Sequence, residues 1–219
     1  MKRFLIIAAI LVGMAVCVAP AHAERGPKVL LIPREGNSRD IELMLTKEVG
    51  VMIITLKDAG FQVVVASASG QPIVGRTTTL EPDLKLADVK VADYAGFIMP
   101  CMAVGLFPGP PVAPEAVAIV KKAVAEGKPV AAQLGSVIIL AEAGVLAGKR
   151  YAFFTDPLNP SYGQERDTRF AGAIYSDINV VQDGNIITSG TSPFIARMFG
   201  FPDGTATLTR ALIAELKKK

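Results

Sequence analysis

The chain has 219 residues, of which 51% are hydrophobic, 20% charged and 6% aromatic, and it contains no Trp. This length suits one α/β domain or two very small ones. The composition excludes disordered, collagen-like and low-complexity chains, because it is rich enough in apolar residues to form a packed core.

The N-terminus has the pattern of a secretory signal peptide. Lys2 and Arg3 precede an apolar run over residues 4–18, and small residues at 21 and 23 close the segment. A membrane-spanning helix needs about 20 apolar residues, so the run is too short for an uncleaved anchor. We therefore expect a signal peptide at residues 1–23, a single domain at residues 24–219, and export to the periplasm or beyond with no stable membrane anchor after cleavage.

Removal of the signal would also remove residues that several kinds of catalytic and metal site require. The signal carries two of the 23 basic residues and none of the 20 acidic ones, which leaves 21 and 20 and a net charge of +1. That balance gives no electrostatic case for nucleic acid as a partner. The signal holds the only His and one of the two Cys, so Cys101 is the single cysteine that remains. This excludes His-based catalysis, His-ligated zinc and an internal disulfide.

Strands and helices alternate along the predicted domain. The apolar runs at residues 28–33, 61–66, 96–100, 129–134 and 150–154 predict buried strands, and a further strand is expected within residues 80–91. Helical spacing predicts helices that end at Asp58, at Glu126 and at Ala143, and one from Thr205 into the lysine tail. Prolines predict an extended loop at residues 106–114. Residues 178–188 predict a hairpin, because Asp183-Gly184-Asn185 supplies positive φ. These elements predict one α/β domain with a mainly parallel sheet between helices.

Several stretches of the chain, in this order, resemble the ThiJ/PfpI family. They lie at residues 40–43, 56–60, 63–67, 82–86, 92–100, 128–132, 140–148 and 183–189. This family, which includes the relatives of Parkinson-disease protein 7, belongs to the class I glutamine amidotransferase-like superfamily. The resemblance implies a flavodoxin-like three-layer sandwich with a C-terminal β-hairpin, and it implies a homodimer.

The resemblance also implies where an active site would lie. Active members carry a nucleophilic Cys at the sharp turn between a strand and a helix, just before a His, with a Glu from the first helix on the thiol and backbone N–H groups forming an oxyanion site. Carried over residue by residue, the nucleophile position falls on Leu134 and its neighbour on Gly135, and the carboxylate falls on Glu42. Cys101 and Met102 replace the usual glycine pair after Pro100. Leucine has no nucleophilic atom, so the family's chemistry cannot run through this position.

Each candidate residue also has a structural interpretation. Glu42 suits the first turn of a helix, where the helix dipole favours a carboxylate. Cys101 follows a central strand and is either a displaced nucleophile or, as we favour, a buried inert thiol. Ser136 suits an N-cap. The charged group Glu165, Arg166, Asp167 and Arg169 suits a solvated loop better than a ligand site. If Leu134 keeps the tight turn and points toward Glu42, its apolar side chain should raise the pKa of that carboxyl.

The sequence thus favours a protein without catalytic activity that binds a small molecule or a protein through Glu42, Cys101, Met102, Leu134 and Gly135. It contains no cofactor motif and no metal-ligand spacing. The alternative is an enzyme of glyoxalase, deglycase or peptidase type, acting on small carbonyl compounds, glycated groups or peptides through Cys101 or another group.

Overall fold

A computed structural model describes residues 26–36, 41–101, 113–160 and 165–218. The predicted signal peptide, Met102 and most of the proline-rich loop lie outside these ranges. Within them, a seven-stranded sheet has the order β10-β11-β7-β6-β1-β2-β5 and is parallel except at β10. The strands of this sheet are β1 (Lys28–Leu31), β2 (Gln62–Ser67), β5 (Leu84–Lys85), β6 (Gly96–Met99), β7 (Val130–Gln133), β10 (Val180–Asp183) and β11 (Ile186–Ser189).

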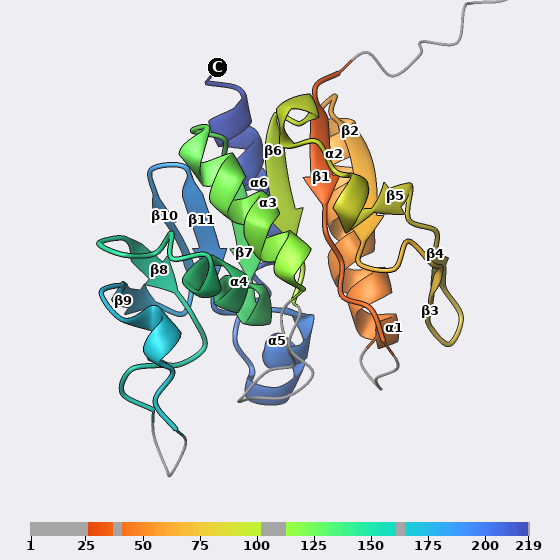
Figure 1. The fold of residues 1–219 in the computed structure, drawn as a ribbon. Coiled ribbons are helices and arrows are strands. Elements are labelled where there is room, and N and C mark those ends of the chain that lie inside the picture. The colour runs from red at the N-terminus through yellow and green to blue at the C-terminus, as the bar shows by residue number, and fades with distance from the viewer. Residues whose placement is uncertain (1–25, 37–40, 102–112, 161–164, 219) are drawn as a thin grey trace, which may run out of the picture.

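Helices cover both faces of this sheet (Figure 1). On one face lie α3 (Pro114–Ala125) and α4 (Val137–Glu142), and on the other α2 (Gly50–Asp58) packs beside α6 (Thr205–Leu216). Each face of the sheet packs against its helices in a hydrophobic core. Alternate residues of a strand point into the two cores, Phe97 and Met99 into one and Ile98 into the other. The predicted three-layer α/β sandwich with its C-terminal hairpin, β10 with β11, is therefore confirmed.

The first helical region departs from the single regular helix that the sequence predicts. A short α1 (Ile41–Leu43) leads into a π-helical segment, η1 (Met44–Val49), and then into α2. A π-segment widens the turn by one residue and is frequent at functional sites. Here it carries Glu48, whose side chain is 3% exposed, into the core beside Met44 and Val49.

Two strand pairs and one short helix lie outside the main sheet. β8 (Arg150–Ala152), predicted as a strand of the main sheet, instead pairs in parallel with β9 (Ile174–Asp177). A small hairpin joins β3 (Ile73–Val74) to β4 (Thr79–Leu80). The helix α5 (Pro193–Phe199) follows β11 and lies below the carboxyl ends of the strands in Figure 1.

Candidate functional site

Leu134 lies at the sharp strand-to-helix turn that the resemblance implies, and its backbone there is strained. Its φ is 46°, the one positive φ at a non-glycine residue in the part of the chain that the structure describes. For an L-residue this conformation costs about 1–2 kcal/mol. The predicted tight turn between β7 and α4 is thus confirmed, and a leucine side chain occupies it.

Hydrogen bonds from Ser136 hold this turn. Its hydroxyl accepts a 2.7 Å bond from the N–H of Gln133 and lies 2.8 Å from the Gln133 carbonyl oxygen and 3.1 Å from that of Met99. Ser136 makes no side-chain cap of α4. Ser136 therefore occupies the predicted N-cap position of α4, but its hydroxyl bonds no N–H of that helix and instead ties the end of β7 to the end of β6.

Cys101 lies next to this turn, at the carboxyl end of β6. It is a buried cysteine, 7% exposed, and it packs with Leu134, Ile195 and Phe154 in a small apolar cluster. Its backbone N–H donates a 2.7 Å hydrogen bond to Oε2 of Glu48. Glu48, a residue that the sequence analysis did not single out, is therefore the carboxylate beside the turn.

Glu42 lies elsewhere, and its expected place facing the turn is wrong. Its carboxylate accepts hydrogen bonds from the backbone N–H groups and the hydroxyls of Thr77 and Thr78, in the loop between β3 and β4. These bonds, led by those from Thr77, lower the pKa of Glu42 from 4.5 to about 2. The expected rise of this pKa is likewise wrong, because four donors surround the carboxylate and Leu134 packs against Cys101 instead.

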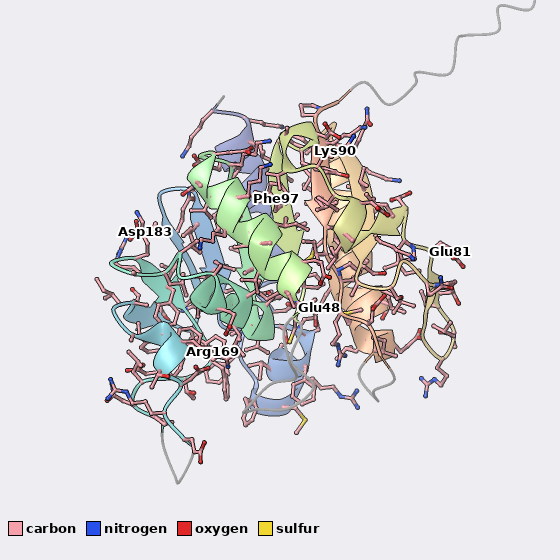
Figure 2. All side chains as sticks on the ribbon, viewed as in Figure 1. Glu48, Glu81, Lys90, Phe97, Arg169 and Asp183 are labelled. Carbon is pink, nitrogen blue, oxygen red and sulfur yellow. The ribbon has the colours of Figure 1, made fainter. Side chains whose placement is uncertain are left out.

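A signal for Glu48 was present in the sequence. Glu48 falls at helical spacing from Met44, Leu45 and Met52, inside the apolar stripe of the first helix. A carboxylate at such a position is buried unless the helix ends first, and burying it requires a polar partner. In Figure 2 the labelled Glu48 lies near the middle of the molecule, whereas Glu81 and Asp183 lie at its edges.

The site occupies the place where parallel α/β sheets bind ligands. The strand order reverses at β1, with β6 on one side and β2 on the other, and such a reversal opens a crevice at the carboxyl ends of the strands. Arg34, which is 5% exposed, follows β1 at this edge, and Cys101 follows β6. A cationic side chain, a carboxylate and a thiol are thus buried around one sheet edge.

The charged residues near Arg169 pair with one another, and the structure offers no metal site or membrane span among the described residues. Arg169 forms ion pairs with Asp167 at 2.6 Å and with Glu142 at 3.6 Å, so these charges are satisfied by one another. The described residues include no cluster of three or more His, Cys, Asp or Glu side chains that could hold a metal ion. Within the same ranges, no helix has the length and apolar character needed to span a membrane.

Comparison with known proteins identifies the family. A model of the DJ-1/PfpI family matches residues 28–199. The chain belongs to the DJ-1/PfpI family. It is 36% identical over 162 residues to an uncharacterized protein of Archaeoglobus fulgidus, covering 73% of this chain and 87% of that one.

Two further comparisons, one with a named relative and one with a solved structure, agree with the family and the fold. A Thermococcus kodakarensis protein named as a deglycase is 31% identical over 170 residues, which cover 74% of this chain and 89% of the relative. The crystal structure of a ThiJ/PfpI domain protein from Brachyspira murdochii superposes with a TM-score of 0.65 at 17% identity, over 89% of this chain and 98% of that one. The latter likeness establishes the flavodoxin-like fold.

Proposed function

We propose that this chain is a member of the family without catalytic activity, which binds a small molecule or a protein segment at the carboxyl ends of β1, β6 and β7. The observation that carries this proposal is that a leucine, Leu134, occupies the position of the nucleophile. The backbone keeps the strained turn at φ 46°, yet the side chain presented there has no nucleophilic atom and packs with Cys101 and Ile195. A strained turn retained without the nucleophile favours a binding role.

The engagement of the Cys101 backbone supports the same proposal. In active relatives, the N–H groups that follow this strand help to form the oxyanion site, according to the resemblance described above. Here the Cys101 N–H already donates to Glu48. A donor held by a protein carboxylate is a poor partner for a developing oxyanion, because the stabilisation depends on donors aimed at the reacting oxygen.

A second candidate function rests on a specific observation. Cys101 is bonded through its backbone to a buried carboxylate, and relatives of this chain include proteins named as deglycases. A thiol moved from the turn to the neighbouring strand would then act on small carbonyl compounds or glycated groups. Against it stands the lack of any His in the predicted mature domain to activate the thiol.

One pair of measurements separates the two functions. Purified protein is assayed for consumption of methylglyoxal and for release of a glycated amine, beside Cys101→Ser. We expect no turnover above the buffer rate for either protein, and slow alkylation of Cys101 in the folded state. Turnover that Cys101→Ser abolishes would establish the thiol enzyme, and turnover that survives it would refute the non-catalytic role without involving the thiol.

We also propose that the protein is exported, on the strength of its N-terminal sequence alone. The intact mass of the protein recovered from outside the cytoplasm should correspond to residues 24–219. A mass that begins at Met1 would contradict this.

A further inference from the structure

A hollow lies at the same edge of the sheet and is not lined by Leu134 or Cys101. It has a volume of about 480 Å³ and is lined by Glu35, Gly36, Ser69, Pro72, Ile73 and Val74. These residues follow the carboxyl ends of β1 and β2 and include both residues of β3. A volume of this size falls within the range of small-molecule sites, about 300–1,000 Å³.

The hollow combines polar groups, the Glu35 carboxylate and Ser69, with the apolar side chains of Pro72, Ile73 and Val74. Ile73 is 4% exposed, and Val74 is 59% exposed at the rim. Glu35 accepts hydrogen bonds from the N–H of Ser69 at 3.0 Å and from its hydroxyl at 2.6 Å. The same N–H also lies 3.2 Å from the second carboxylate oxygen, Oε2. These bonds from Ser69 fix the carboxylate in position and still leave acceptor sites on its two oxygens, since a carboxylate has about four.

Glu35 is charged at neutral pH. Partial burial acts to raise its pKa, but hydrogen bonds from Ser69 and Ser67 outweigh burial and hold the pKa below its ordinary value of 4.5. No lysine or arginine contributes to this shift, and none of the described basic residues forms an ion pair with Glu35. The hollow therefore contains a fixed negative charge that the described protein does not neutralise.

We propose that this hollow binds a small protonated amine that carries a short apolar chain. The ammonium group would donate to Glu35, and the apolar chain would lie against Pro72, Ile73 and Val74. An ammonium supplies both the charge and the donors that an ionised carboxylate lacks here, whereas a carboxylate ligand would be repelled. The site is independent of the one at Leu134, so either proposal can fail without the other.

The test uses butylammonium as probe, with butyrate and 1-butanol as matched ligands of the same chain length. We expect millimolar binding of butylammonium in an NMR titration, with shift changes at the Ser69 and Gly70 amides. Butyrate and butanol should bind about fivefold more weakly or not at all, and 0.5 M KCl should weaken binding of butylammonium. Equal binding of all three probes would overturn the proposal.

Two variants test the residue assignment. Glu35→Gln keeps an acceptor for Ser69 but removes the charge, and it should weaken butylammonium binding about fivefold. Val74→Lys places a competing ammonium at the exposed rim and should weaken binding to a similar extent with Glu35 intact. The control Glu81→Gln removes a carboxylate that does not line the hollow and should leave binding unchanged. Binding unaffected by both Glu35→Gln and Val74→Lys would refute the assignment.

Discussion

The backbone N–H of Cys101 donates a 2.7 Å hydrogen bond to Oε2 of Glu48, across 53 residues of sequence. Both residues are buried, Glu48 at 3% and Cys101 at 7% exposure. The bond joins the π-helical segment η1 to the carboxyl end of β6. It satisfies a buried donor, and a buried polar group without a partner is costly.

Replacement of Glu48 should therefore destabilise the fold. We expect Glu48→Ala to lower the free energy of unfolding by about 2–3 kcal/mol, because it leaves the Cys101 N–H without its acceptor in the core. Glu48→Gln is the matched control, since its amide oxygen can still accept that bond, and it should cost less than half as much. Urea unfolding at pH 7 measures both. Equal losses for the two variants would show that the bond to Cys101 does not account for the effect.

The carboxylate of Glu42 should make the stability of the protein depend on acid. Its pKa is about 2 in the folded chain, below the ordinary value of 4.5, because the folded state bonds to the charged form through Thr77 and Thr78. The unfolded state therefore binds a proton more readily than the folded state does. The stabilisation of the fold by the Glu42 carboxylate is fully present above pH 4.5 and is lost as the pH falls toward 2.

Urea midpoints at pH 7, 4 and 2.5 measure this dependence. The urea midpoint of Glu42→Gln should fall less steeply between pH 4.5 and 2.5 than that of the natural protein, since the glutamine side chain is not protonated in that range. Glu81→Gln, an exposed carboxylate, serves as the control and should follow the natural curve. An acid limb identical in the natural protein and Glu42→Gln would contradict the bonded arrangement at Thr77 and Thr78.

The strained backbone at Leu134 predicts that a glycine variant is more stable than an alanine variant, the reverse of the usual order. Leu134→Ala removes the buried side chain but keeps a Cβ at φ 46°, and should cost about 2 kcal/mol of stability. Leu134→Gly removes the same contacts and also relieves the strain, so it should be about 1 kcal/mol more stable than the alanine variant. At an ordinary helix or strand position glycine is the less stable of the two. Thermal unfolding of the pair decides, and alanine as the more stable variant would refute the strain at this turn.

The layered sheet was predictable because its signals are local. The apolar runs that became β1, β6 and β7 are short and end in turns, and Asp183-Gly184-Asn185 specified the hairpin of β10 and β11. Helix α5 was missed, although Pro193 at its first turn and Gly200 at φ 75° after its end are start and stop signals. The two-residue strands β3 and β4 are too short to show an alternating pattern.

The site was harder to predict because its key contact is not local. Family spacing pointed to Glu42, and although the apolar stripe marks Glu48 as a buried carboxylate, its partner follows only from the tertiary pairing of η1 with Cys101. No local signal within Met44–Val49 marks the π-turn that the structure has there. The turn at Leu134, in contrast, was specified by the sequence on either side of it.

The final prediction concerns Leu134→Cys, which restores a thiol to the strained turn. Leu134 and Glu48 both contact Cys101, one through the apolar cluster and the other through its backbone, so the new thiol would lie in the neighbourhood of Glu48 and not of Glu42. We expect faster alkylation than at Cys101 but at most slow turnover of methylglyoxal, because Gly135 supplies no imidazole and the Cys101 N–H remains bonded to Glu48. Leu134→Ser, which has no thiol, controls for the smaller side chain. Robust turnover by Leu134→Cys that Leu134→Ser lacks would show that the missing thiol alone silences the natural protein, and that the bond from Cys101 to Glu48 leaves an oxyanion site intact.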